Sequence, residues 1–293
     1  MAALPQSLAE DGWKGMVLTM DNRPIGVFDS GLGGLTVVRQ MFAALPHERI
    51  IYFGDTGRVP YGTRSRETIE KYARQDSRFL LGRGVKLIIA ACGTVSSVAP
   101  HVLDALPVPA LGVVEPAADA ALRATRSGRI GVLGTPATIR SQAFERRLTA
   151  AGVRAYTQAC PLFVPLVENG WIRRDDEVTR LTAARYLGPL RDKGIDTLIL
   201  GCTHFPLLTD ILSDILGPGV RLIDAGREAA AACLRCLRES DSLCGDENTG
   251  GGTFYVSDRP EDFSHVAGIF LGREVEGDVH TVEIEDMENG DPA

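Results

Sequence analysis

Val85-Lys-Leu-Ile-Ile-Ala-Ala-Cys92-Gly-Thr94 is a short apolar run that ends in a thiol followed by small residues. Ile195-Asp-Thr-Leu-Ile-Leu-Gly-Cys202-Thr-His204 repeats this pattern, and its cysteine lies 110 positions further on (202 − 92 = 110). Runs of this kind are typical of buried parallel strands. Because ligands bind at the carboxyl ends of strands in open α/β sheets, both thiols are predicted to face a binding cleft.

The two thiols indicate a particular kind of chemistry. Presented from two related strands, they would place one acid/base group on each face of a bound substrate. That arrangement can remove a proton from one side of a stereocentre and return one from the other. His204 lies two residues after Cys202, where it could lower the pKa of the thiol or donate a proton. A lone histidine is more often structural, so its interpretation depends on this cysteine.

The whole chain alternates apolar runs with amphipathic stretches, which predicts an α/β fold with a mostly parallel sheet. The predicted strands are 25–28, 50–53, 87–90, 110–114, 130–133, 198–200 and 221–223. The predicted helices are 35–44, 66–83, 139–150, 175–193 and 226–239. Gly84 and Gly194 close two of these helices, where a left-handed C-terminal cap is expected.

An internal repeat accompanies the cysteine pair. Gly26-Val-Phe-Asp-Ser30 resembles Gly131-Val-Leu-Gly-Thr135, and Val114-Glu-Pro-Ala-Ala-Asp-Ala120 resembles Ile223-Asp-Ala-Gly-Arg-Glu-Ala229. Any two α/β segments can look alike by chance, but three pairs in near register favour a duplication. We therefore predict two homologous, open parallel-sheet domains, related by a pseudo-twofold duplication, that face a shared cleft.

The repeat sets the predicted domain boundaries. The first α/β domain comprises residues 24–116 together with 228–282, and the second comprises 117–227. Residues 1–23 form an N-terminal extension without clear periodicity. Either Met20 is the natural start of the protein and the residues before it do not belong to it, or the extension is a docked regulatory arm. Residues 283–293 form an acidic tail with glycine and proline, and are predicted to be disordered.

The composition excludes several classes of protein. A chain of 293 residues with 44% hydrophobic and 24% charged residues is typical of a soluble globular protein. Its net charge of −7 argues against direct binding to nucleic acid or to an anionic membrane. No apolar stretch approaches the roughly 20 residues that span a bilayer, and no secretion signal is recognisable. A cytoplasmic location is expected.

The remaining cysteines do not predict a metal site. Cys160, Cys233, Cys236 and Cys244 are interpreted as small hydrophobic residues with free thiols. Cys233-Leu-Arg-Cys236 is a C-x-x-C sequence, but it lies in a helical pattern without a second pair of ligands. We therefore predict that no metal is bound.

Pyridoxal phosphate is not expected either, although it is the usual cofactor for acidifying the α-hydrogen of an amino acid. Its Schiff base needs a lysine in the site. The lysines of the chain are Lys14, Lys71, Lys86 and Lys193. None is predicted to lie beside the cysteines, so a mechanism that relies on thiols alone follows more naturally.

Two loops are candidate ligand-binding segments. Asp29-Ser-Gly-Leu-Gly-Gly34 follows the first strand, but Thr36 stands where a dinucleotide fingerprint needs its third glycine. Its backbone N–H groups could bind a carboxylate while Asp29 or Ser30 binds an ammonium group, and a simple capped turn is an equal alternative. Asp55-Thr-Gly-Arg-Val-Pro-Tyr-Gly62 could form a ligand wall or an ordinary surface loop.

Six motifs in this order resemble the bacterial glutamate racemases, within the cofactor-independent aspartate/glutamate racemase superfamily. They are Val27-Phe-Asp-Ser-Gly-Leu-Gly-Gly-Leu35, Tyr52-Phe-Gly-Asp55, Val59-Pro-Tyr-Gly62, Cys92-x-Thr94, Cys160-Pro-Leu-Phe-Val-Pro-Leu-Val-Glu168 and Gly201-Cys-Thr-His-Phe-Pro-Leu207. The resemblance covers about residues 24–275 and implies interconversion of L- and D-glutamate, which supplies D-glutamate for peptidoglycan. It leaves open a homodimer and activation by a cell-wall precursor.

The resemblance also assigns roles to residues of this chain. Cys92 and Cys202 would be the catalytic acid/bases, the first acting on the D-enantiomer and the second on the L-enantiomer, and Asp29 and His204 would assist them. The substrate-binding positions would be Asp29, Ser30, Pro60, Tyr61, Gly62, Gly93, Thr94, Thr203 and His204. Asp55 and Glu168 would give further support.

Position 93 departs from the family pattern, because Gly93 replaces an asparagine whose amide contacts the substrate. Loss of a buried, charge-assisted hydrogen bond costs about 1.5–3 kcal/mol, unless water replaces the amide. The alternatives are therefore weakened activity, a related racemase acting on aspartate, or a regulatory paralogue that has lost catalysis. A decarboxylase of the superfamily would need only one thiol, so the second cysteine counts against it.

Overall fold

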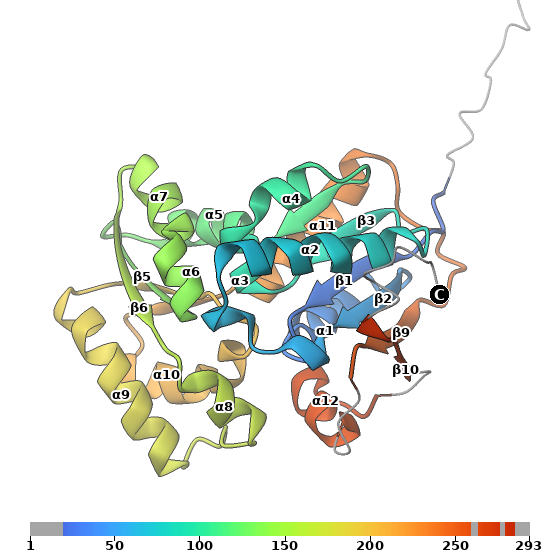
Figure 1. Cartoon of the computed structure of the whole chain (residues 1–293). Coiled ribbons are helices and arrows are strands. Elements are labelled where there is room, and N and C mark those ends of the chain that lie inside the picture. Colours follow the sequence, from blue (N-terminus) through green and yellow to red (C-terminus); the bar gives the residue numbers. More distant parts are fainter. Residues whose placement is uncertain (1–19, 259–262, 276–278, 285–293) are drawn as a thin grey trace, which may run out of the picture.

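Two parallel sheets flanked by helices make up the molecule (Figure 1). The computed structural model describes residues 20–258, 263–275 and 279–284. The first sheet has six strands in the order β10-β9-β2-β1-β3-β4, and the second has four in the order β6-β5-β7-β8. Every strand pairing is parallel. The predicted α/β class with two open parallel sheets is confirmed.

The elements alternate along the chain. The strands are β1 (Ile25–Asp29), β2 (Arg49–Gly54), β3 (Leu87–Ala90), β4 (Ala110–Gly112), β5 (Arg129–Gly134), β6 (Arg154–Ala159), β7 (Thr197–Leu200), β8 (Arg221–Asp224), β9 (Gly251–Val256) and β10 (Val279–Thr281). The α-helices are α1 (Leu35–Ala44), α2 (Arg66–Leu81), α3 (Gly93–Val98), α4 (Pro100–Asp104), α5 (Val114–Ala124), α6 (Pro136–Ser141), α7 (Ala143–Ala150), α8 (Phe163–Glu168), α9 (Glu177–Asp192), α10 (Thr209–Leu216), α11 (Ala225–Glu239) and α12 (Phe263–Leu271). Short 3-10 helices are η1 (Thr56–Arg58), η2 (Tyr61–Thr63) and η3 (Phe205–Leu208).

Both sheets share one strand order, which supports the predicted duplication. Four strands of the first sheet run β2-β1-β3-β4, and the second sheet runs β6-β5-β7-β8. In each half the first strand therefore pairs with the second and third strands, and the fourth lies at an edge. The segments that carry Cys92 and Cys202 follow equivalent strands, β3 and β7. The exact domain boundaries stay a prediction.

Several predicted boundaries were wrong. The strand predicted at 110–114 ends at Gly112, because α5 begins at Val114 and takes Pro116 into its first turn, where proline is tolerated. The helix predicted at 139–150 is two helices, separated by Gln142 with a left-handed φ of 56°. Gly84 and Gly194 have φ values of 67° and 63°, as expected after a helix.

Alternating side chains of the first sheet pack into two hydrophobic cores, one on each face of the sheet. Val27 and Ile89 point to the face that α1 and α11 cover, and Phe28 and Ile88 point to the face that α2 covers. The second sheet is covered likewise, by α9 and α10 on one face and by α5 and α7 on the other. Covering both faces explains why these strands read as continuous apolar runs. The helices leave the carboxyl ends of the strands in both sheets uncovered, and the residues of the candidate site follow these ends.

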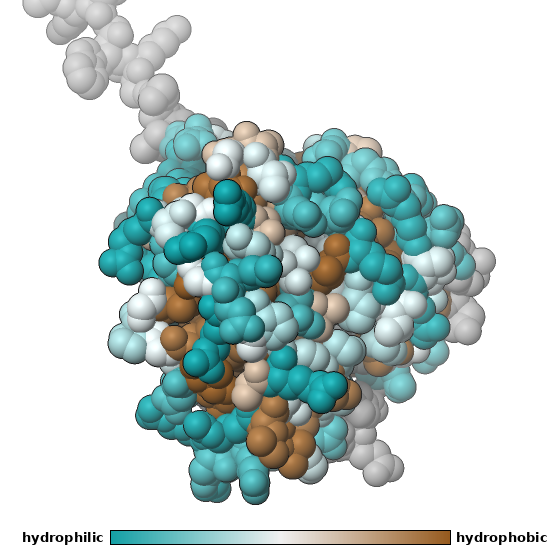
Figure 2. All heavy atoms as spheres, turned by 90° about the vertical axis from the view of Figure 1, so that its left-hand side faces the viewer, coloured by the Kyte–Doolittle hydropathy of each residue, from teal (hydrophilic) through white to brown (hydrophobic). Residues whose placement is uncertain are grey.

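The end of the molecule with α7 and α9 is mostly hydrophilic, with apolar patches between (Figure 2). Leu162, Trp171, Val178 and Leu181, on or beside α8 and α9, are exposed large apolar side chains. Among the described residues, no helix is long and apolar enough to cross a membrane.

A buried ion pair ties the start of β3 to distant parts of the chain. The Lys86 ammonium lies 2.7 Å from the Glu48 carboxylate, and both side chains are almost fully buried. Lys86 Nζ also donates to the carbonyl oxygens of Asp21 and Ser242, each at 2.7 Å. The last residues of the predicted N-terminal extension are therefore docked, whereas residues 1–19, like 285–293 of the predicted tail, lie outside the described ranges.

We expect Lys86→Met to lower the free energy of unfolding by about 3–5 kcal/mol, because it leaves the Glu48 carboxylate buried without its partner. Arg123→Gln, which breaks an exposed pair with Glu228, should cost less than about 1 kcal/mol. Urea unfolding measures both. A loss at Lys86 as small as that at Arg123 would show that the buried pair contributes little.

Candidate active site

The two cysteines lie at the carboxyl ends of their sheets. Cys92 is two residues beyond β3 and is the N-cap of α3, and Cys202 is two residues beyond β7. Both thiols are buried, and both line one cavity of about 360 Å³ between the two halves. Two equivalent strands thus bring thiols 110 positions apart to a single site.

Most of the predicted site residues line this cavity. They are Ser30, Pro60, Tyr61, Gly62, Cys92, Gly93, Thr94, Glu168, Cys202, Thr203 and His204. Asp29 and Asp55 do not line it. Among the described residues no lysine lines the cavity, and Lys86 is held in its ion pair with Glu48.

Asp29, at the end of β1, is buried beside the cavity. Its Oδ2 accepts a hydrogen bond of 2.8 Å from the backbone N–H of Gly34, and among the described residues its Oδ1 has no partner. Burial raises the pKa of this carboxyl, and the charge of His204 opposes that shift.

The environment of Cys92 favours the neutral thiol. Its Sγ lies 3.6 Å from Ser30 Oγ. Burial and then the nearby charge of Asp29 raise the pKa of Cys92 to about 12. At neutral pH Cys92 is therefore a proton donor.

Cys202 has a cationic neighbour instead. Its Sγ lies 3.8 Å from His204 Nδ1, and His204 Nε2 lies 3.0 Å from Glu168 Oε1. Burial lowers the pKa of His204, but the interactions with Cys202 and Glu168 outweigh it and raise this pKa to about 10. A protonated imidazole therefore places a positive charge beside the Cys202 sulfur.

The backbones of the two halves approach each other very closely here. A Cβ atom on Gly33 would collide with the Thr203 hydroxyl and the ring of His204. A Cβ atom on Gly93 would collide with the backbone carbonyl oxygen of Gly201. The space that a side chain at position 93 would need is therefore already occupied by the end of the opposite strand.

A buried polar network supports the wall formed by Pro60 to Gly62. The Tyr61 hydroxyl donates to Asp55 and also lies 3.1 Å from an oxygen of Asp76. Arg58 bridges the same two carboxylates, at 2.6 Å from Asp55 and 3.1 Å from Asp76. Sequence analysis named Asp55 and Tyr61 but missed Arg58 and Asp76, since Asp76 lies inside a helix without a recognisable motif.

Thr135 and Cys160 also line the cavity and were not predicted as site residues. Thr135 Oγ1 lies 3.0 Å from Thr94 Oγ1, which joins the two halves. The internal repeat aligned Thr135 with Ser30, so it held the signal that could have found this residue. Cys160 is fully buried, in keeping with its interpretation as a small hydrophobic residue.

Comparison with known proteins identifies the family. The family model described as Asp/Glu/Hydantoin racemase matches residues 25–233. The chain belongs to this family. Cys92, Cys202, His204 and Glu168 all fall within the matched region.

Relatives match the Asp/Glu/hydantoin racemase chain over nearly its whole length. A glutamate racemase of Geobacter metallireducens is 46% identical over 90% of this chain and 97% of its own. One from Syntrophus aciditrophicus is 48% identical over 87% of this chain and 94% of its own. The crystal structure of a Francisella tularensis glutamate racemase in complex with D-glutamate superposes with a TM-score of 0.84, at 39% identity, and covers 91% of this chain and all of its own.

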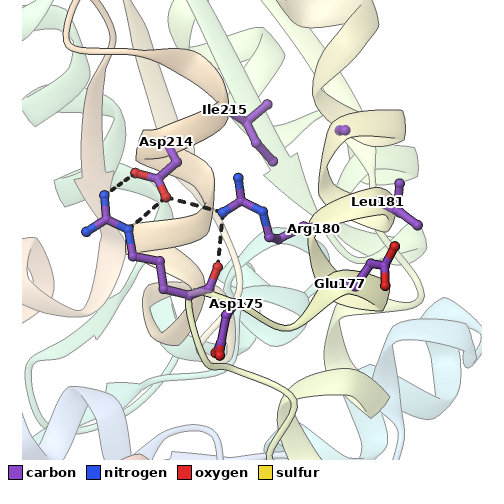
Figure 3. A pocket seen from close by; sticks show the side chains of 8 residues that line it. Asp175, Glu177, Arg180, Leu181, Asp214 and Ile215 are labelled. Atoms are coloured by element: carbon purple, nitrogen blue, oxygen red, sulfur yellow. Dashed lines mark hydrogen bonds and ion pairs between the residues drawn. The ribbon is translucent and has the colours of Figure 1, made fainter.

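A second hollow, of about 820 Å³, lies on the surface between α9 and α10 (Figure 3). Both of its arginines are already paired, because Asp214 accepts from Arg174 at 2.5 Å and from Arg180 at 3.2 Å. In this racemase-family chain it lies apart from both cysteines and offers no reactive group. The described residues also contain no cluster of three or more His, Cys, Asp or Glu side chains that could hold a metal ion.

Gly93→Asn tests whether the family asparagine fits this chain. We expect the variant to lower both stability and activity, because its Cβ must push the Gly201 carbonyl and the adjoining Cys202 away. Overpacking of this kind costs about 1–3 kcal/mol. Urea unfolding and a racemase assay measure the two effects, with Gly188→Asn on the open face of α9 as the control. A gain in turnover would show that the site lacks the amide and has room for it.

Proposed function

We propose that this chain interconverts L- and D-glutamate by cofactor-independent proton transfer between two cysteines. The observation that carries the proposal is that Cys92 and Cys202 reach one cavity from two equivalent strands of different sheets. The family membership and the two glutamate racemases at 46% and 48% identity support the substrate.

The cavity has groups suited to an amino acid. Its volume of about 360 Å³ is within the range of small-molecule sites. The hydroxyls of Ser30, Thr94 and Thr203, which line the cavity, can donate hydrogen bonds to the substrate carboxylates. A role for the buried Asp29 stays a prediction. Pro60, Tyr61 and Gly62 close one side of the site.

The unequal environments of the thiols assign their starting roles. Cys202, beside protonated His204, acts as the base and takes the α-proton of L-glutamate. Cys92, which is neutral, donates its proton to the opposite face and yields D-glutamate. The products are then a Cys202 thiol and a Cys92 thiolate, so the reverse reaction starts from the second state. Glu168 holds His204 in its charged form.

The α-hydrogen of an amino acid is far less acidic than a thiol, so the site must stabilise the carbanion. Each pKa unit of mismatch costs about 1.4 kcal/mol. Oriented donors in a water-excluded cavity supply such stabilisation. The charge of protonated His204 and the hydroxyl pair of Thr94 and Thr135 lie around this space. Asp55, together with Arg58 and Asp76, holds the wall formed by Pro60 to Gly62 in place.

The cellular role belongs to the same proposal. D-Glutamate made in the cytoplasm would supply peptidoglycan precursors, without pyridoxal phosphate or metal. Activation by a cell-wall precursor stays a prediction, and so does a homodimer. A second copy would have apolar surface to bury at Leu162, Trp171, Val178 and Leu181.

Because Gly93 replaces the family asparagine, two alternatives compete with this function: racemisation of aspartate, and a regulatory role without catalysis. The close approach of the Gly201 carbonyl to Gly93 argues that the glycine is accommodated by the packing rather than leaving a gap. Assays with L-aspartate beside L-glutamate distinguish the substrates. Turnover of neither would favour the regulatory paralogue.

Circular dichroism of purified protein with L-glutamate, and then with D-glutamate, tests this function without added pyridoxal phosphate. We expect the signal of either enantiomer to decay toward zero. Cys92→Ser and Cys202→Ser should each lower kcat by at least about 10²-fold, because general acid–base groups contribute about 10²–10⁴-fold. Cys236→Ser, on α11 outside the cavity, is the matched control. Retained turnover in either site variant would rule out the two-thiol mechanism.

The pH profile tests the role of His204. Its charged form is present below its raised pKa of about 10 and is lost as the pH rises through that value. We therefore expect kcat/KM for L-glutamate to fall above about pH 10. Glu168→Gln removes the carboxylate that helps to raise this pKa, so the fall should move to lower pH. Glu239→Gln should leave the profile unchanged, and an unmoved profile in Glu168→Gln would contradict the assigned role.

A further inference from the structure

A third hollow, of about 410 Å³, lies against the outer side of the wall that bounds the catalytic cavity. Four arginines line it: Arg64, Arg66, Arg140 and Arg146. The first two come from the start of α2, and the other two from the end of α6 and from α7. Both halves of the molecule therefore contribute positive charge to one small space.

Only part of this positive charge is paired. No carboxylate is among the described residues that line the hollow, although the whole chain has a net charge of −7. Arg66 lies 3.4 Å from Glu70, and Arg146 Nη1 donates to the carbonyl oxygen of Ser141 at 2.7 Å. In the described part of the chain, the guanidinium groups of Arg64 and Arg140 make no ion pair or hydrogen bond. Two arginines are thus free to bind an anion.

The rest of the hollow suits a small anionic group. Ile69 and Val98 give it an apolar floor, and Ser65 and Ser141 add hydroxyls. The 16-residue helix α2 begins at the hollow, so its positive end adds to the arginine charges. Its volume lies within the range of small-molecule sites. Guanidinium groups bind phosphate oxygens in bidentate geometry.

The hollow and the catalytic cavity share their separating wall. Tyr61, Gly62 and Thr135 face the cavity, and Arg64 and Ala137, which follow them in the chain, face the hollow. A ligand held by arginines of both halves would therefore bridge η2 and α6 directly behind the substrate. Its contacts would be separate from those of glutamate.

We propose that this hollow is a phosphate-binding site, in which Arg64 of one half and Arg140 of the other bind the same phosphate group. The group can belong to inorganic phosphate or to a nucleotide. Because the ligand binds the folded state and joins its two halves, it raises the melting temperature of the protein. The inference does not rest on the racemase activity.

Isothermal titration calorimetry of the full chain with inorganic phosphate, pyrophosphate and ADP, each against chloride at constant ionic strength, tests the site. We expect binding of at least one probe, and at least about a tenfold weaker Kd in Arg64→Gln/Arg140→Gln, since charge-assisted hydrogen bonds are lost. Arg154→Gln/Arg221→Gln, which removes two exposed arginines at the starts of β6 and β8, is the matched control. The probe that binds should raise the Tm of the wild type and of the control variant, but not the Tm of Arg64→Gln/Arg140→Gln.

The outcomes separate the alternatives. Binding of inorganic phosphate identifies the free anion as sufficient, and binding of ADP alone identifies a nucleotide. Absence of binding by all three probes would overturn the inference, and so would equal weakening in the control variant. If the wild type binds phosphate but shows no racemase turnover, that result counts against the proposed function and not against this site.

Discussion

The site depends on a close approach of two backbones. Gly93 follows the first cysteine, and the carbonyl oxygen of Gly201, just before the second, occupies the place of its missing side chain. Gly33, in the loop after β1, lies equally close to the side chains of Thr203 and His204. Because side chains are absent at these contacts, the two halves can bring both thiols to one small cavity. The spacing of the reactive groups is thus set by main-chain contact, which side-chain motion cannot relax.

Two thiols of the same type acquire different properties from their neighbours. Cys92 lies in a buried place beside the carboxylate of Asp29, which disfavours a second negative charge. Cys202 lies beside an imidazole that Glu168 keeps charged. The internal repeat therefore supplies the symmetry that a racemase needs. The residues that differ between the halves, Asp29 and His204, place a carboxylate beside one thiol and an imidazole beside the other.

The sequence predicted the central strands well but missed three strands farther from the middle of the sheets. β1, β3, β5 and β7 are buried on both faces, so their apolar runs were recognisable. β6, β9 and β10 were missed, because as outer or half-buried strands they mix polar residues and glycine with few apolar ones. The break at Gln142 between α6 and α7 was not predicted, because nothing in the neighbouring sequence indicates a residue with left-handed backbone conformation.

For the site, motifs at strand ends were predictive and contacts across the fold were not. Cys92, Cys202 and the loop after β1 stand directly after recognisable strands. Asp76 instead reaches Tyr61 and Arg58 from the middle of α2, a contact that only the packing of α2 onto the first sheet creates. The meaning of Gly93 likewise depended on the opposite strand end, which sequence alone could not place.

The order of strands in the first sheet has a consequence for synthesis on the ribosome. β9, which pairs with β2, begins at Gly251, after the whole second sheet has been made. Until then the nascent chain can pair β2 with β1 but leaves its other edge open, and an open edge invites pairing with other chains. The second sheet needs no residue beyond Asp224 and can close earlier. Nascent first halves should therefore be the more aggregation-prone, and a chaperone would be needed most in the interval between these two segments.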